Sequence, residues 1–177
     1  MKQFLRTMMA LAMTLFASVA FADHVKLGKL TIMQPEIRET PKEAPVSAGY
    51  LKIRNDGDEA DTLLSASSGF SGMVQLHKME VVDGVARMRP QKNGIPIPAG
   101  GEVVLENGGL HIMFMKLEEQ MKAGDHHTVT LTFEKAGKVD VEMHVVALDG
   151  KDHSGHGDHD HDHDHDGEKK EHSDHSH

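Results

Sequence analysis

The 177-residue sequence contains no cysteine. The absence of thiols excludes disulfide bonds, a catalytic thiolate, cysteine-ligated zinc, iron–sulfur clusters and blue-copper electron-transfer centres, whose thiolate ligand is indispensable. Positive charge is scarce too, because 19 Lys and Arg stand against 28 Asp and Glu, giving a net charge of −9. Nucleic acid is therefore not an expected partner, since phosphate contacts need a basic surface. The sequence is instead rich in imidazole and thioether groups, with 15 His and 12 Met.

The first 22 residues differ in composition from the rest of the sequence. Lys2 and Arg6 precede an apolar run from Met8 to Ala17, and the segment closes on Ala20-Phe21-Ala22. A charged start, a short apolar centre and a small-x-small end are typical of a secretory signal peptide, and the apolar run is too short to span a membrane. We therefore expect cleavage after Ala22, a mature chain without a membrane span, and a location in the bacterial periplasm.

The last segment, residues 152–177, also differs in composition. It has nine acidic residues, two lysines and no large apolar residue, so it has nothing to bury in a core and should be a disordered tail. Its nine histidines are His153, His156, His159, His161, His163, His165, His172, His175 and His177. Between the signal peptide, 1–22, and this tail, residues 23–151 should form one folded domain, which is long enough to enclose a core.

Within this domain, apolar and polar residues alternate in short runs, which is the period of a β-strand. Turn-forming groups such as Asn55-Asp56-Gly57-Asp58, Asn93-Gly94 and the segment 96–101 separate the runs. No run of ten or more residues shows a convincing helical stripe. The prediction is an all-β fold, an antiparallel Greek-key sandwich or barrel. Its expected strands include Val46–Arg54, Met73–Val82, Glu102–Leu105, His111–Leu117, His126–Phe133 and Lys138–Leu148.

One hairpin can be placed in register from the sequence. Asp83-Gly84 lies between Val82 and Val85, and Asp-Gly between apolar residues is a strong signal for a two-residue hairpin turn. This turn pairs residue 79 with 88 and residue 77 with 90. Met79 then faces Met88, and His77 is a diagonal neighbour of Met88 at about 7–8 Å between backbones. One imidazole and two thioethers should therefore lie on one face of the hairpin.

A second expected strand also carries His and Met on one face. His111, Met113 and Met115 share that face by the period of two, whereas Ile112 and Phe114 should point into the core. If this strand lies beside or across from the hairpin, two imidazoles and two or more thioethers meet. Thioethers are soft and neutral, so such a set favours Cu(I) over zinc, calcium or magnesium. On the pattern alone, packing remains the alternative, because methionine is an adaptable core filler.

The spacing of these residues resembles the signature of the bacterial periplasmic copper chaperones of the PCu(A)C family, also called DUF461 proteins. That signature is a His, ten residues, a Met, about twenty-one residues and His-x-Met. Here His77 is followed by ten residues, Met88, twenty-two residues and His111-Ile112-Met113. We expect the additional residue in the Gly- and Pro-rich connection from Gln91 to Gly109, where an insertion costs little.

The similarity to this family extends over most of the domain. It includes Ala48-Gly49-Tyr50-Leu51, Asn55, Gly84, Met88-Arg89-Pro90, Pro98-Ala99-Gly100-Gly101, Gly108-Gly109 and Leu131-Thr132-Phe133-Glu134. The resemblance implies a cupredoxin-like β-barrel or sandwich. It also implies delivery of copper toward the copper centres of respiratory cytochrome oxidase, or buffering of copper in the periplasm. The counterparts of the family's Cu(I) ligands are His77, Met88, His111 and Met113.

The remaining His and Met residues of the domain have no place in the signature. Met79 and Met115 would be auxiliary donors or a soft lining of the site. We interpret three others as ordinary strand-surface or core histidines, namely His126, His127 and His144.

The tail allows two interpretations. It could be only a solvated acidic segment, but nine imidazoles raise the local ligand concentration, and nitrogen and oxygen donors suit Cu(II), Zn(II) or Ni(II) better than Cu(I). We therefore predict that the tail binds a divalent ion. Tethering would allow it to pass metal to the domain at high effective concentration, with a reductant acting between the two copper states.

Three classes of function remain open from the sequence. We favour a monomeric copper carrier whose partner is a copper-accepting protein of respiratory oxidase assembly. An enzyme is disfavoured, because the sequence has no cysteine nucleophile and no evident Ser/His/Asp set, and two histidine ligands are few for copper redox catalysis. The alternative is a periplasmic metal buffer or sequestering protein, or an accessory binding protein for zinc or nickel, and this alternative depends on the tail.

Overall fold

The computed structural model describes residues 24–147, which contain eleven strands and no helix. The predicted signal peptide, its cleavage after Ala22 and the predicted metal-binding tail lie outside the described residues. Within residues 24–147, no helix is long and apolar enough to cross a membrane. The strands are β1 (His24–Leu27), β2 (Leu30–Arg38), β3 (Val46–Asn55), β4 (Asp61–Ser68), β5 (Ser71–Val82), β6 (Val85–Pro90), β7 (Ile95–Ile97), β8 (Glu102–Leu105), β9 (Leu110–Leu117), β10 (His126–Phe133) and β11 (Lys138–Val146).

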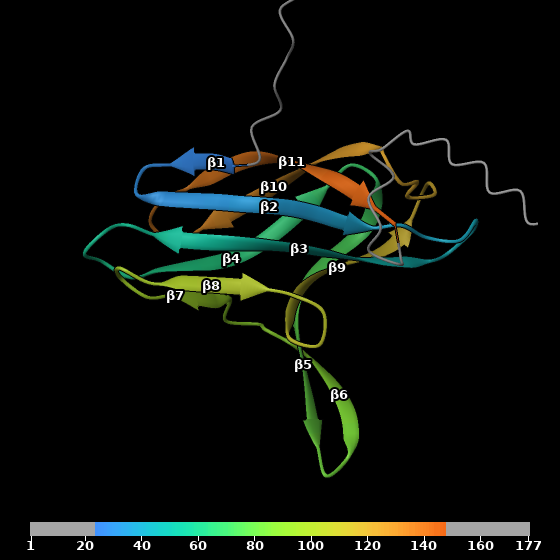
Figure 1. The fold of residues 1–177 in the computed structure, drawn as a ribbon, viewed down its shortest axis with the longest axis horizontal. Helices are drawn as coiled ribbons and strands as arrows, with labels where there is room; N and C mark the ends of the chain where they lie inside the picture. The colour runs from blue at the N-terminus through green and yellow to red at the C-terminus, as the bar shows by residue number, and fades with distance from the viewer. Residues whose placement is uncertain (1–23, 148–177) are drawn as a thin grey trace, which may run out of the picture.

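All of these strands belong to one open sheet that wraps around the core (Figure 1). The strand order is β6-β5-β9-β8-β3-β2-β11-β10-β4-β7, with β1 added beside β2 and a further pairing between β9 and β3. The all-β prediction is therefore confirmed, but the purely antiparallel sheet is not. The pairs β11–β2 and β8–β9 are parallel. Most of the domain separates β2 from β11 in the sequence, so the chain has the long connection that parallel neighbours need.

The six expected strands agree with β3, β5, β8, β9, β10 and β11 to within a few residues. The hairpin register is also confirmed, because Met79 pairs with Met88 and Val82 with Val85. Asp83 and Gly84 both have positive φ values, 55° and 77°, as this two-residue turn requires. One expectation was wrong. The segment 96–101 was assigned to a turn, whereas residues 95–97 form β7, which pairs only with β4 at the end of the strand order, where a proline is tolerated.

The core lies between the inward faces of the strands. Ile112 and Phe114 are fully buried, as the strand period predicts, and they pack with Ile53, Leu131 and many other aliphatic residues. The backbone of β3 approaches this core closely at Gly49. A Cβ there would lie 2.8 Å from Cε2 of Phe114, so the packing of the phenyl ring requires glycine at this position.

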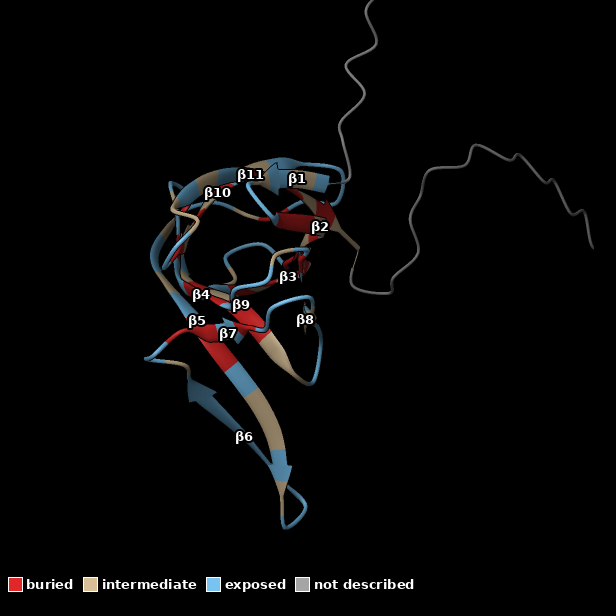
Figure 2. Ribbon diagram, turned by 90° about the vertical axis from the view of Figure 1, so that its left-hand side faces the viewer, coloured by how far each residue is buried: buried red, intermediate tan, exposed pale blue. Residues whose placement is uncertain are grey.

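The outer part of the β5–β6 hairpin projects from the body of the domain (Figures 1 and 2). All six residues of β6 are exposed, and β6 pairs only with β5. One face of this arm is charged, because Glu80 forms ion pairs with Lys78 and Arg89 at 3.8 and 3.3 Å. The opposite face, by strand alternation, carries Met79 and Met88.

Candidate metal centre

Three adjacent strands, β6, β5 and β9, bring the predicted ligands onto one face. His77 on β5 pairs with His111 on β9, and Gln75 pairs with Met113 one row further along. On the other side of the histidine row, Met79 pairs with Met88 of β6. Residues paired in register point to the same face of a sheet. The condition set by the sequence, that the second strand lies beside the hairpin, is therefore met.

The two histidines are the buried part of this cluster. His77 is 9% exposed and His111 is 5% exposed, and their ring centroids lie 5.8 Å apart in an edge-to-face arrangement. A metal–nitrogen bond is about 2 Å long, so this centroid separation is compatible with one ion bound by both imidazoles.

Hydrogen bonds select the ring nitrogen that each histidine can offer. Nδ1 of His111 lies 3.1 Å from the carbonyl oxygen of Gly109, which only accepts, so Nδ1 carries the proton and Nε2 keeps its lone pair. Nε2 of His77 lies 2.9 Å from Oε1 of Gln75, so His77 donates through Nε2 and keeps a lone pair on Nδ1. Among the described residues, that Nδ1 is buried without a hydrogen-bond partner. A lone pair in this position is available to a ligand.

The surroundings of His77 favour its neutral imidazole form. Burial lowers the pKa of His77, and the neighbouring His111 lowers this pKa further. A neutral ring is the form that coordinates a metal. His77 therefore stays neutral at pH values where a solvated histidine begins to take up a proton.

The methionines differ in how close they lie to the histidine pair. Met113 and Met79 are half-buried and occupy the rows on either side of it, whereas Met88 is 47% exposed and is one strand further out. Met115 lies four residues from His111, about 13 Å along the strand, which is too far for both to contact one ion through a short link. Its partner Met73 is 39% exposed and was missed by the sequence analysis, although its place two residues before Gln75 on the same face could have identified it.

The donor set of this centre is soft. In residues 24–147, no three His, Asp or Glu side chains are grouped in a way that could hold a metal ion. The thioethers of Met79, Met88 and Met113 lie on the same face as His77 and His111. Two imidazoles and thioethers fit Cu(I) and fit poorly to Zn(II) or Mg(II).

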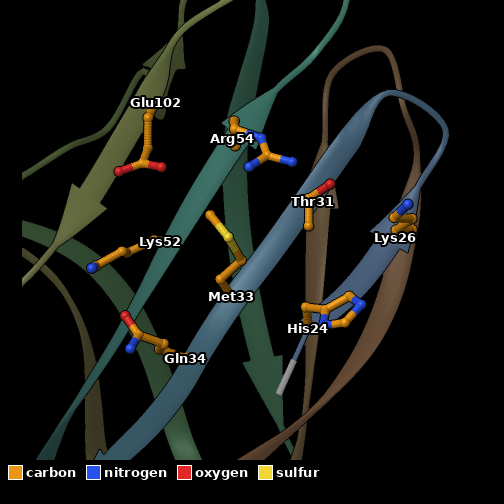
Figure 3. Close-up of a pocket in the computed structure, with 8 residues that line it drawn as sticks. All are labelled: His24, Lys26, Thr31, Met33, Gln34, Lys52, Arg54 and Glu102. Atoms are coloured by element: carbon orange, nitrogen blue, oxygen red, sulfur yellow. The ribbon is translucent and has the colours of Figure 1, made fainter. Parts of the chain in front are cut away.

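A separate groove of about 580 Å³ opens on the outer face of β1, β2, β3 and β8 (Figure 3). His24 and Met33 line it, but Lys26, Lys52 and Arg54 do so as well. These three cationic side chains outnumber the one carboxylate of the lining, that of Glu102, which makes the groove unfavourable for a copper ion. None of the residues predicted to bind Cu(I) lines it.

The fold of the domain matches solved structures of PCuAC domains. The copper-bound PCuAC domain of PmoF2 aligns with a TM-score of 0.61 at 25% identity, covering 71% of this chain and 99% of that domain. The solution structure of apo-DR1885 from Deinococcus radiodurans aligns with a TM-score of 0.55 at 22% identity, covering 78% of this chain and 93% of that protein. The cupredoxin-like class and the resemblance seen in the sequence are thereby confirmed.

The model of the family described as putative lipoprotein LpqE-like matches residues 30–145, and the chain belongs to this family. The putative lipoprotein Lxx21020 of Leifsonia xyli subsp. xyli (strain CTCB07) is 34% identical over 110 residues. That alignment covers 62% of this chain and 63% of the relative, which is less than two thirds of its length.

Proposed function

We propose that this protein binds Cu(I) at His77, His111, Met113 and Met88 and carries the ion to a copper-accepting protein of respiratory oxidase assembly. The observation that carries the proposal is the buried Nδ1 of His77, which has no hydrogen-bond partner among the described residues and belongs to a histidine pair on a methionine-bearing face. The copper-bound PCuAC domain of PmoF2, which shares the fold, supports copper as the ion.

The arrangement of the ligands favours transport of the ion over permanent retention. The histidines are buried, but Met88 is exposed on β6 of the projecting hairpin. An acceptor can displace this outer thioether first and approach the ion from the exposed side. Neutral donors hold Cu(I) without thiolate charge, so a cysteine-containing acceptor binds the ion more strongly. Met79 is the register partner of Met88, two residues from His77 on β5, and is the auxiliary donor during this exchange.

We also propose a location for the protein and a role for its His-rich tail. The protein is exported to the periplasm, where its His-rich tail binds Cu(II) or another divalent ion and supplies the domain with copper. Metal transport, and not catalysis, is the activity. A periplasmic metal buffer, or an accessory protein for zinc or nickel, is the alternative that the nine tail histidines favour.

Growth under copper limitation distinguishes copper delivery from metal buffering. A strain that lacks the protein should have an oxidase with less copper and lower activity, and added copper should restore both. His111→Ala should fail to complement the strain, whereas His24→Ala, which changes an exposed histidine far from the centre in sequence, should complement it. Purified Cu(I)-loaded protein should also transfer its ion to an apo acceptor with cysteine ligands. Normal oxidase at every copper level, together with lost copper or zinc tolerance, would establish buffering instead of delivery.

A further inference from the structure

A further pair of methionines lies on the face of β5 and β9 that carries His77 and His111. Met73 of β5 and Met115 of β9 are direct register partners, and Val46 of β3 is the partner of Met115 on its other side. Residues paired in register point to the same face of a sheet, with Cβ atoms about 4.5–5.5 Å apart. Three neighbouring strands therefore place two thioethers side by side.

Burial in the core does not account for this pair. Met73 is 39% exposed and Met115 is half-buried, whereas Met121 and Met143 in the core are 0% exposed. Methionine commonly fills gaps in a core, and the two buried methionines fit that role. Part of each side chain of the outer pair is instead accessible to an ion from solvent.

The donors at this pair are soft and uncharged. The next row toward the histidines holds Met113 of β9 between Gln75 of β5 and Ala48 of β3, and none of the six residues in the two rows is charged. Two thioethers, with a third in the neighbouring row, suit a soft monovalent ion such as Cu(I). The same donors are unsuitable for Zn(II), Ca(II) or Mg(II), which bind nitrogen, thiolate or hard oxygen ligands.

The distance to the histidines makes this pair a separate site. Each step of two residues along β9 is about 7 Å, so Met115 lies about 13 Å from His111 and Met113 lies midway between them. Methionine has a flexible side chain with three rotatable bonds. Met113 can therefore turn its sulfur toward either row, and an ion can pass from the outer pair to the histidines in two short steps.

We propose that Met73 and Met115 form a second Cu(I) site, which takes up the ion and passes it to the histidine centre through Met113. Metal binding at the pair requires only the thioethers, whereas its role in uptake rests on the proposed Cu(I) binding at His77 and His111. The pair binds the ion less firmly than the centre does, because it offers fewer donors. The ion is Cu(I) at both sites, so its movement transfers no electron.

Methionine methyl signals test this site in the full-length mature protein with ¹³C-labelled methyl groups. Asparagine in place of the nine tail histidines removes competing imidazoles. The first equivalent of Cu(I) should shift the signal of Met113, and a second equivalent should shift those of Met73 and Met115. The buried Met121 and Met143 are internal references whose signals should stay in place. Unshifted signals of Met73 and Met115 after the second equivalent would overturn the site.

Substitutions that conserve volume separate the effect of sulfur from that of packing. Met73→Ile/Met115→Ile should lower the amount of bound Cu(I) from about two equivalents to about one, and the variant should remain folded because size and apolarity are nearly conserved. Val46→Ile is the matched control, because Val46 lies in the same row, is also 39% exposed and contains no sulfur. Unchanged stoichiometry in the double variant would overturn the site.

Two measurements distinguish failure of this site from failure of the Cu(I) centre. His111→Ala should abolish binding at the centre but preserve the shifts of Met73 and Met115. In stopped-flow experiments with a chromophoric Cu(I) chelator as donor, the double variant should load its centre about tenfold more slowly, because the pair no longer holds the ion beside it. The affinity of the centre should change less than about twofold, as expected for distant sites. Equal loading rates would overturn the uptake role, and a larger loss of affinity would overturn the separation of the two sites.

Discussion

His77 and His111 are direct register partners on β5 and β9, and each donates one hydrogen bond from a ring nitrogen to a different acceptor. Oε1 of Gln75 accepts the hydrogen bond from Nε2 of His77, whereas the backbone carbonyl of Gly109 accepts the hydrogen bond from Nδ1 of His111. The pair therefore offers two unlike nitrogens, Nδ1 and Nε2, from neighbouring strands. This difference makes the two histidines separately testable.

The requirement of Cu(I) binding for thioether sulfur can be tested with substitutions that conserve the side-chain volume. Met113→Ile and Met88→Ile remove sulfur but nearly conserve size and apolarity, so the domain should remain folded with a change below about 1.5 kcal/mol. Cu(I) affinity, measured by competition with a chromophoric chelator, should fall strongly in both variants. The loss should be larger for the half-buried Met113 than for Met88, whose exposed side chain has Met79 as a neighbouring substitute. Parental affinity in the double variant would place the site elsewhere.

Gln75 should act as a positioning residue for His77. Gln75→Leu removes the acceptor of Nε2, so the proton can move to Nδ1 and occupy the lone pair that the ion needs. We expect Cu(I) affinity to fall about tenfold, and the ¹⁵N chemical shifts of the His77 ring in the apo protein should show a change of tautomer. Gln91→Leu is the control, because the side-chain amide of Gln91 donates to the backbone carbonyl of Arg89 and not to a histidine. An unchanged tautomer with unchanged affinity would remove Gln75 from the site.

Local sequence patterns predicted how the residues of this centre are arranged within the β5–β6 hairpin and within β9. The register of the β5–β6 hairpin followed from Asp83-Gly84 alone, and the common face of His111 and Met113 followed from the strand period. The pairing of β5 with β9 could not be predicted, because it joins segments more than thirty residues apart and depends on the whole sheet order. The tautomers of His77 and His111 could not be predicted from the sequence either, because they depend on hydrogen bonds to Gln75 and to the carbonyl of Gly109.

The strands that the sequence analysis missed have weak or misleading patterns. β2 starts with three consecutive buried residues, Leu30 to Ile32, and has an irregular register between Met33 and Glu36, so alternation is lost. β4 is rich in serine. Parallel pairing of β2 with β11 places β2 inside the sheet, where neighbours on both sides stabilise a segment of poor local pattern.

Asp61 at the start of β4 should be a major stabilising contact of the fold. Its carboxylate accepts hydrogen bonds from the backbone N–H groups of Thr62, Lys135 and Ala136 at 2.7, 2.9 and 2.9 Å. Asp61→Asn loses the charge and part of this set, and should lower the free energy of unfolding by about 1–3 kcal/mol in urea titrations. Asp58→Asn, at an exposed position, should change it by less than about 0.5 kcal/mol. Equal stability of the two variants would contradict this role.

The same carboxylate should contribute to acid sensitivity. Burial by itself raises the pKa of Asp61, but the three backbone N–H donors and the charge of Lys135 outweigh it, so the pKa lies below its ordinary value. A lowered folded-state pKa means that the stabilisation is complete above the unfolded-state value of about 3.9 and is lost as the pH falls through the folded-state value. Unfolding titrations of the apo protein between pH 5 and pH 2 should show a decline that is smaller in Asp61→Asn.

The two kinds of copper site should release their metal at different pH values. Tail imidazoles have a reference pKa of about 6.5, and neighbouring aspartates favour protonation further, so Cu(II) on the tail should be lost between about pH 7 and pH 5. Burial and the adjacent His111 lower the pKa of His77, and thioethers do not titrate, so Cu(I) in the domain should be retained to lower pH. Equilibrium dialysis of Cu(I)- and Cu(II)-loaded protein across this range measures both losses. The variant with asparagine at the nine tail positions isolates the domain, and a Cu(I) release midpoint there that equals that of the tail would show that the buried pair gives no protection from protons.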